Sequence, residues 1–316
     1  MSMKLTRTVF AAASFALCHA AFAAAPMVMT QAPGFYRTML GDFEVTALND
    51  GTIDLPPEKL LHAKADKIKK ALDAAFVGSP VQTSVNAYLI NTGSKLVLID
   101  AGAGALFGPT VGQLAANLKA AGYQPEQVDE IYITHLHGDH LGGVSPAGSI
   151  AFPNATVRVD KHDADYWLDK SKMETAPAEL KGLFQGAITT LEPYIKANRL
   201  QTFEGDTELV PGVKALGTHG HTPGHTTYVV ESKGQKLLVI GDLIHVGAVQ
   251  LADPTVTINF DSDSKAAMAQ RLKTFSAAAK DGSLVGAAHI QFPGLGHLKQ
   301  TGKSYQWVPV NYTQIR

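Results

Sequence analysis

The chain contains a single cysteine and almost no net charge. Its 316 residues include 27 Lys and Arg against 28 Asp and Glu, which gives a formal net charge of -1. Without a basic excess there is no reason to expect a nucleic-acid partner or attraction to an anionic membrane surface. The one cysteine, Cys18, lies in the N-terminal segment. The rest of the chain therefore has no thiol and no disulfide, and any metal site in it must use His, Asp and Glu.

The first 25 residues have the pattern of a secretory signal peptide. Lys4 and Arg7 precede an apolar, alanine-rich run, and Ala21 and Ala23 form a small-x-small cleavage motif. An N-terminal anchor helix is the alternative interpretation, but the apolar run is short for a membrane span. We therefore expect cleavage, a periplasmic or secreted location, and no stable membrane insertion of the mature protein.

Residues 26–316 contain no Pro/Gly-rich linker, so we expect them to form one domain. Single strands are predicted for EIYIT and ATVRVD, and strand pairs for FEVTALNDGTIDL (with a turn at residues 49–51), NAYLINTGSKLVLIDAG and TTYVVESKGQKLLVIGDL. The spacing of apolar residues predicts helices over residues 57–76, 111–121, 161–170, 177–198 and 265–280. Strand pairs covered by helices, twice over, indicate an α/β sandwich of two mostly antiparallel sheets.

The stretch THLHGDHLGG, residues 134–143, places three histidines and an aspartate directly after an apolar strand. His135 and His137 are two residues apart, so on an extended backbone they can point the same way and bind one cation. Asp139 and His140 follow on the turn and can reach a second cation beside the first. A His-rich surface loop without a metal is the alternative, and the combination of these residue types at this spacing disfavours it.

One loop cannot complete two metal sites, and further candidate ligands follow downstream. GTHGHTPGHTT holds His219, His221 and His225, IGDL holds Asp242, and AAHIQFPG holds His289. Each of these motifs lies in a loop or at the end of a strand, and a carboxylate at the position of Asp242 can bridge two cations. Taken singly, each histidine would be interpreted as a structural residue. Together they supply enough ligands for two cations.

In this order, the motifs HLHGDH, GHTPGH and GD, followed by a late histidine, resemble the metallo-β-lactamase superfamily. From PGFYRTMLGDFEVTAL to VPVNY, the chain is similar to the methyl parathion hydrolase group, which has lactonase and arylesterase relatives. The resemblance implies an αββα sandwich of two mixed, mostly antiparallel sheets flanked by helices. It also implies a two-metal centre and a homodimer.

The resemblance assigns the ligands of both cations. One cation takes His135, His137 and His221, the other takes Asp139, His140 and His289, and the two are bridged by Asp242. His225 is implied to lie behind these ligands and to hold the orientation of one of them. Zn²⁺ is the expected cation, although Mn²⁺, Co²⁺ and Fe²⁺ also suit His and Asp ligands. No ligand role is assigned to His219, which is interpreted as a polar loop residue.

Such a centre predicts hydrolytic chemistry. Two cations about 3.5–4 Å apart can share one water and lower its pKa from about 15.7 toward 7, so that a bridging hydroxide becomes a nucleophile at neutral pH. The cations also polarise the C=O or P=O bond of the substrate. Asp139 can relay a proton to the leaving oxygen, and Asp242 holds the two cations together. Hydrolysis of an ester, a lactone or a phosphotriester is therefore expected.

The resemblance also places aromatic residues at the entrance of the substrate pocket, namely Phe107, Trp167 and Phe184. Without the resemblance, ordinary core packing would be the simpler interpretation of these residues. With it, the expected substrate is small, flat and apolar, such as an aryl ester.

Four positions depart from the methyl parathion hydrolase pattern. That group has arginine at the position of Leu60, leucine at that of His245, and threonine and leucine at those of Ile258 and Phe260. His245 lies three residues after Asp242 and is expected to face the metal pocket, with substrate contact and plain packing as open alternatives. Ile258 and Phe260 are two residues apart in an extended-looking segment, so both can project to one side. These bulky groups predict a tight pocket that favours a planar carbonyl.

Hydrolysis of aryl esters and lactones such as dihydrocoumarin is therefore the leading hypothesis, and organophosphate triester hydrolysis is the alternative. A β-lactamase is disfavoured because the cysteine ligand of one subclass is missing and Asp242 does not fit the others. A long-chain acyl-homoserine lactonase typically has tyrosine at the position of His245, so that substrate is less favoured. The non-enzyme alternative is a periplasmic metal-binding protein, which would bind metal without turnover.

The signal-peptide interpretation predicts a mature chain that begins near Ala24 or Pro26 and is found in the periplasm or outside the cell. N-terminal sequencing of protein purified from the native host checks this. Recovery of the protein with Met1 still attached would contradict the interpretation.

Overall fold

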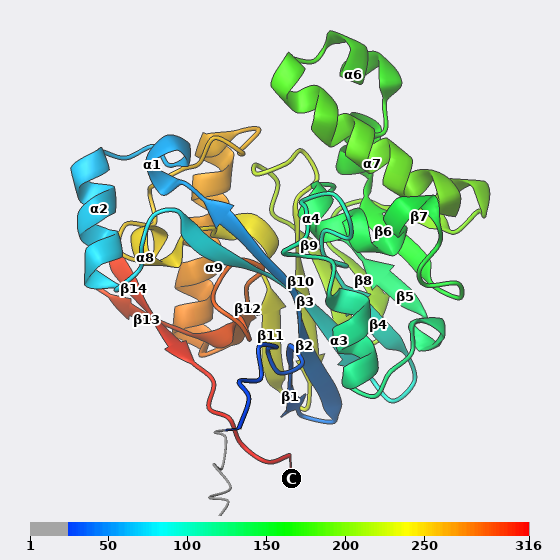
Figure 1. The fold of residues 1–316 in the computed structure, drawn as a ribbon, viewed down its shortest axis with the longest axis horizontal. Helices are drawn as coiled ribbons and strands as arrows, with labels where there is room; N and C mark the ends of the chain where they lie inside the picture. Colours follow the sequence, from blue (N-terminus) through cyan, green and yellow to red (C-terminus); the bar gives the residue numbers. More distant parts are fainter. Residues whose placement is uncertain (1–24, 316) are drawn as a thin grey trace, which may run out of the picture. The chain divides into compact units, whose positions relative to one another are not determined.

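The computed structural model describes residues 25–315, so most of the predicted signal segment lies outside the described residues. From Pro33 onward the chain forms one compact unit. This unit is built around two β-sheets with helices on their outer faces (Figure 1). Between residues 25 and 315, no helix combines the length and the apolar character that a membrane span requires.

The first sheet has seven strands, and neighbours in the sheet follow chain order. They are β1 (Phe35–Leu40), β2 (Phe43–Leu55), β3 (Val81–Asn91), β4 (Leu96–Ile99), β5 (Glu130–Tyr132), β6 (Thr156–Asp160) and β7 (Leu200–Phe203). Strands β1 to β4 pair antiparallel, whereas β4 to β7 pair parallel. Parallel neighbours need long crossover connections, and these connections carry the helices that cover this sheet.

The second sheet also has seven strands in chain order. They are β8 (Thr207–Val210), β9 (Val213–Gly217), β10 (Thr226–Ser232), β11 (Gln235–Val239), β12 (Leu284–Gly286), β13 (Leu295–Thr301) and β14 (Ser304–Pro309). Here β11 and β12 pair parallel and the other neighbours pair antiparallel. Both sheets are therefore mixed, and most neighbouring pairs in the two sheets taken together are antiparallel, as the sequence predicted.

The helices lie in two outer layers and one cluster at the side (Figure 1). Helices α3 (Leu114–Ala120), α5 (Lys161–Trp167) and α7 (Ala178–Lys196) pack on the outer face of the first sheet, with α6 (Lys170–Thr175) against α7. Helix α9 (Ser264–Asp281) covers the outer face of the second sheet. Helices α1 (Pro57–Leu60), α2 (Ala65–Ala74) and α8 (Gly247–Gln250) lie near or within a separate apolar cluster. Helix α4 (Gly138–Leu141) follows β5.

Apolar side chains fill the space between the two sheets. Val45 and Ile90 from the first sheet meet Tyr228 and Val239 from the second in one buried cluster. Burying a Val, Leu, Ile or Phe side chain contributes roughly 1.5–3 kcal/mol relative to leaving it exposed. Because the chain after residue 25 has no cysteine, stability has to come from such packing rather than from disulfides.

Two of the predicted secondary-structure elements are wrong in detail. The turn predicted at residues 49–51 is a bulge inside the long strand β2, where the pairing with β3 shifts between Asn49 and Gly51. The helix predicted over residues 57–76 is split into α1 and α2. The chain leaves the helix at Leu61 because Leu61 forms an isolated β-bridge with Ile258. Both differences arise from pairing with distant segments.

Asp50 fixes the bulge in β2 and ties it to the loop that leads into α3. Its buried carboxylate accepts hydrogen bonds from the backbone N–H groups of Ala103 at 2.8 Å, Gly112 at 2.9 Å and Leu114 at 2.9 Å. Burial raises the pKa of Asp50, while these three donors lower it. One side chain therefore satisfies three backbone donors in a segment without regular secondary structure.

Asp50→Ala should lower the free energy of unfolding by at least about 3 kcal/mol, because three backbone donors lose their acceptor at roughly 1–3 kcal/mol each. Urea denaturation of the metal-free protein measures the change. Asp54→Ala is the matched control, since Asp54 is an exposed carboxylate on the same strand. A loss for Asp50→Ala no larger than that of the control would show that the three hydrogen bonds do not hold the loop.

Candidate metal site

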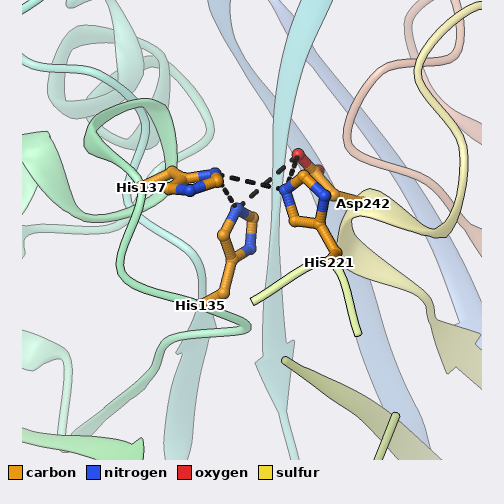
Figure 2. A group of neighbouring side chains, drawn as sticks. All are labelled: His135, His137, His221 and Asp242. Atoms are coloured by element: carbon orange, nitrogen blue, oxygen red, sulfur yellow. Dashed lines mark hydrogen bonds and ion pairs between the residues drawn. The ribbon is translucent and has the colours of Figure 1, made fainter. Parts of the chain in front are cut away.

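Loops after β5, β9, β11 and β12 bring seven distant His and Asp residues together. The first group contains His135, His137, His221 and Asp242, whose side chains converge on one point (Figure 2). The Nδ1 atom of His137 lies 3.0 Å from Nε2 of His135 and 3.1 Å from Nε2 of His221. Oδ2 of Asp242 lies 3.6 Å from Nε2 of His135 and 3.3 Å from Nε2 of His221.

The second group contains Asp139, His140 and His289, and it lies on the other side of Asp242. Oδ1 of Asp242 lies 3.1 Å from Nε2 of His140 and 3.2 Å from Nε2 of His289. Oδ2 of Asp139 lies 3.7 Å and 3.4 Å from the same two nitrogens. Asp242 thus presents one carboxylate oxygen to each group, which is the arrangement of a bridging ligand.

The distances between these atoms, 3.0–3.7 Å, span the range expected for ligands that share a cation. Nitrogen and oxygen ligands bound at about 2.0–2.2 Å to a tetrahedral cation lie roughly 3.3–3.5 Å from one another. Two buried atoms, Nε2 of His140 and Oδ1 of Asp242, lie 3.1 Å apart, but neither has a hydrogen-bond partner of good geometry. Buried polar atoms without a partner are rare, so a charge between the two groups would satisfy them. The donor set suits two transition-metal cations.

The charges of the site are tightly balanced. Burial opposes the charged form of His221, but Asp242 and Asp261 outweigh it and raise the pKa of His221 to about 9. Burial likewise opposes ionisation of Asp242, and the nearby His140 and His289 nevertheless hold the pKa of Asp242 well below its usual range. Burial lowers the pKa of His135 well below its usual range. Metal binding requires the ligating imidazoles to be deprotonated, so binding should release protons.

The ring nitrogens that face away from the cluster are held by acceptors. Nδ1 of His140 lies 2.9 Å from Oδ2 of Asp100, and Nδ1 of His221 lies 3.0 Å from Oδ1 of Asp261. Nδ1 of His289 lies 2.9 Å from the backbone oxygen of Ser84. Such acceptors fix the imidazole tautomer and ring orientation, leaving Nε2 free for a metal.

His225 lies behind the ligands rather than among them. The backbone N–H of Asp242 donates to Nε2 of His225 at 3.0 Å, and Nδ1 of His225 lies 2.9 Å from Oγ1 of Thr218. Burial lowers the pKa of His225 to about 3, so the ring is neutral and Nε2 can accept. In this position His225 holds the backbone that carries Asp242.

Asp163 joins the two loops that carry most of the histidines, although nothing in the sequence pattern distinguishes it as a site residue. It is buried in α5 and accepts from Leu136 N–H at 2.8 Å, in the first histidine loop. It also accepts from Oγ1 of Thr222 at 3.0 Å and from Gly224 N–H, both in the second histidine loop. Burial raises the pKa of Asp163 to about 6, so it is mostly ionised at neutral pH. Asp100 is easier to single out in the sequence, because it is a carboxylate directly after the apolar strand residues LVLI.

The aromatic residues predicted at the entrance have three different surroundings. Phe107 is 42% exposed, and its ring lies against the backbone of Gly138 in the ligand loop. Trp167 is buried with its ring edge-on to that of His137, at 5.3 Å between centroids. Phe184 has no exposed surface and packs behind Trp167 at 4.7 Å. Of the three, Phe107 offers an open face, whereas Phe184 supports Trp167 from the core.

The two residues predicted to project together, Ile258 and Phe260, do not share one environment. Ile258 is fully buried in the apolar cluster that includes Val246, with the partly buried Leu60 packed against it. Phe260 is 40% exposed, and its ring centroid lies 6.0 Å from that of His245. The extended segment assumed for these residues is interrupted, because a turn brings Asp261 N–H to the backbone oxygen of Ile258 at 3.1 Å. The expectation that both project to one side is therefore wrong.

His245 lies beside Asp242, facing the ligand groups. Its Nε2 lies 3.0 Å from Oδ2 of Asp242, and its ring is nearly parallel to that of His289 at 5.4 Å. The residue is buried, and neither ring nitrogen has a hydrogen-bond partner of good geometry. His245 therefore has unused hydrogen-bonding capacity directed at the site.

Comparisons with known proteins give the family. Residues 81–289 match the family described as the Metallo-beta-lactamase superfamily, and the chain belongs to it. The solved structure of the hydrolase AbOPH in the beta lactamase superfamily is 39% identical, with a TM-score of 0.86 over 90% of this chain and 100% of that chain. The structure of AidC, a dizinc quorum-quenching lactonase in complex with the product N-hexanoyl-L-homoserine, is 26% identical, with a TM-score of 0.82 over 89% of this chain and 99% of that chain.

Similar curated proteins include N-acyl homoserine lactonases. That of Bacillus cereus is 31% identical over 156 residues, which are 49% of this chain and 54% of the relative. That of a Bacillus sp is 37% identical over 125 residues, or 39% of this chain and 42% of the relative. The chain thus spans about half the length of the curated relatives it matches. The superfamily and the αββα fold predicted from the sequence are confirmed.

Asp163→Asn should weaken metal binding by roughly 10–100-fold, the usual cost of losing a group that orients ligands. The amide of asparagine has only one acceptor atom, so one of the two histidine loops would lose its hydrogen bond to residue 163. Competition with a chelator measures the affinity. Asp165→Asn is the matched control, because Asp165 is exposed on the same helix and its side chain pairs with the exposed Lys161. Unchanged metal affinity in Asp163→Asn would contradict the anchoring role.

Proposed function

We propose that this chain is a metal-dependent hydrolase that opens lactones and cleaves aryl esters. The observation that carries the proposal is the pair of ligand groups that share one carboxylate, Asp242, at a buried site. When two divalent cations are bound there, they supply an activated water at neutral pH and polarise the carbonyl oxygen of the substrate. No serine or cysteine nucleophile is required.

Asp139 is the residue best placed to handle the proton of the reaction. Its Oδ2 faces His140 and His289, and its side chain is among the more accessible of the seven ligand residues. The free oxygen of Asp139 can therefore take a proton from the attacking water and deliver it to the leaving oxygen of the ester. A phenolate leaving group, with a pKa of about 10, needs less of this help than an alkoxide.

The surroundings of the ligands support a flat, apolar substrate. Phe107 and Phe260 are the partly exposed aromatic side chains beside the site, and His245 lies between Phe260 and Asp242. Two surface cavities of about 550 Å³ and 470 Å³ lie elsewhere, around Val77 and Gly78, and no ligand residue lines either of them. We therefore place the substrate at the face of the metal site that Phe107 and Phe260 flank.

The relatives support the lactone part of this proposal. Three of the four relatives named above are described as lactonases, namely the two Bacillus N-acyl homoserine lactonases and the dizinc lactonase AidC, whereas AbOPH is described only as a hydrolase. A lactone is an ester closed on itself, so the same carbonyl chemistry serves both substrate types. Zn²⁺ is the proposed metal in both groups, and secretion and a homodimer are part of the proposal. The alternatives are phosphotriester hydrolysis and metal binding without turnover.

The value of kcat/KM for dihydrocoumarin or an aryl ester should exceed that for methyl paraoxon by at least about 100-fold, or some 2.7 kcal/mol. The reason is that His245 and Phe260 restrict a tetrahedral phosphorus centre with two methoxy groups more than a planar carbonyl. Steady-state kinetics of the metal-replete protein on these substrates, with N-hexanoyl homoserine lactone and a penicillin, give the ranking. Equal rates for the lactone and the phosphotriester would favour the triesterase alternative.

His245→Leu should narrow this gap by making room beside the metals, and His297→Leu, an exposed histidine on β13, is its control. Two bound metals per chain with no turnover of any substrate would instead support a metal-binding protein.

A further inference from the structure

A third group of metal-ligand side chains lies outside the seven residues described above. It contains Asp160, His162 and His219, and one ligand atom of each lies within 4.8 Å of the others. Asp160 ends β6, His162 lies in α5, and His219 belongs to the loop between β9 and β10. The group shares no residue with the two groups at Asp242, so a cation here would be additional to the two proposed for hydrolysis.

The geometry of this group resembles that of the hydrolytic site. Nδ1 of His162 lies 2.9 Å from Oδ1 of Asp160, and Nε2 of His219 lies 3.3 Å from Oδ2 of Asp160. The two imidazole rings are 4.8 Å apart between centroids and inclined by 53°, so they are not stacked but approach one carboxylate from two sides. The spacing at His219 equals the roughly 3.3 Å between neighbouring ligands of a tetrahedral cation, whereas the shorter spacing at His162 is that of a hydrogen bond, which a cation would replace.

The charge and exposure of the group also suit a cation taken from solvent. The Asp160 side chain is 1% exposed, whereas that of His162 is 49% exposed. Water can therefore reach the imidazole of His162, while the carboxylate of Asp160 is buried. The backbone N–H of His162 donates to Oδ1 of Asp160 at 2.7 Å, which holds that carboxylate in place. Asp163 and Asp206 add negative charge near His219.

We propose that Asp160, His162 and His219 form an accessory site for a transition-metal cation such as Zn²⁺. Two imidazoles and one carboxylate favour Zn²⁺, Ni²⁺ or Cu²⁺ over Mg²⁺ and Ca²⁺, which prefer oxygen ligands. Water completes the coordination on the exposed side. The cation crosslinks helix α5 to the loop that also carries His221 and His225.

This crosslink has a structural consequence for the hydrolytic site. Asp163 in α5 already holds the same loop through Thr222 Oγ1 and Gly224 N–H. A cation between His162 and His219 would fasten the loop to the helix at a second point, outside the buried core. Excess Zn²⁺ should therefore stabilise the zinc-loaded protein beyond what the two buried cations provide, because it binds the folded state.

The test is isothermal titration of Zn²⁺ into protein that already holds two zinc ions per chain. One further site per chain is expected, with no corresponding site for Mg²⁺. In His162→Ala this site should weaken by more than the roughly 10–100-fold that loss of an orienting group costs, because a ligand is removed. His297→Ala, which removes an exposed histidine elsewhere, should keep it. Excess Zn²⁺ should raise the Tm of the unmodified protein and of His297→Ala, but not that of His162→Ala.

His162 is exposed and its replacement should not disturb folding, so the test does not depend on a His219 variant. Anomalous scattering at the zinc edge should show a peak between Asp160, His162 and His219. Absence of a third site in the unmodified protein would overturn the proposal. Undiminished third-site binding in His162→Ala would also overturn it, because the cation would then lie elsewhere. Neither result would bear on hydrolysis, which is assayed separately.

Discussion

The buried carboxylate of Asp242 is the constraint on which the rest of the site depends. Nitrogens of five histidines lie 3.0–3.6 Å from its two oxygens, namely those of His135, His140, His221, His245 and His289. A buried charge is costly unless it is paired. The histidines that surround Asp242 come from four separate loops, so the pairing depends on how the fold brings these loops together. The two sheets make this approach possible, because the loops after β5, β9, β11 and β12 open at one edge of the sandwich.

A second layer of carboxylates keeps the histidines in place. Asp100 and Asp261 hold the far nitrogens of His140 and His221, while Asp163 holds the backbones of two loops. Each of these groups accepts several donors or faces an imidazole, so its burial is offset by hydrogen bonds. These hydrogen bonds orient the ligand side chains, which limits the reorganisation that metal binding or substrate binding would require.

The same helix serves both the proposed hydrolytic site and the proposed accessory site. Helix α5 presents Asp163 toward the buried loops and His162 toward solvent, and Asp160 lies just before its first residue. The loop between β9 and β10 is divided in the same way, with His221 buried and His219 partly exposed. With cations bound at both proposed sites, the loop between β9 and β10 would be attached at two places, through His221 at the buried site and through His219 at the accessory site.

The sequence by itself determined the ligand types, their order and the sandwich of two sheets, because these follow from local patterns: histidines after apolar strands, and alternation of strand pairs with helices. Only the tertiary structure decided which residues meet. In the structure, residues 49–51 form a bulge within a strand rather than the predicted turn. Ile258 is buried whereas Phe260 is partly exposed, and Asp163 accepts hydrogen bonds from two different loops. These outcomes depend on contacts between segments distant in the chain, and no local pattern encodes such contacts.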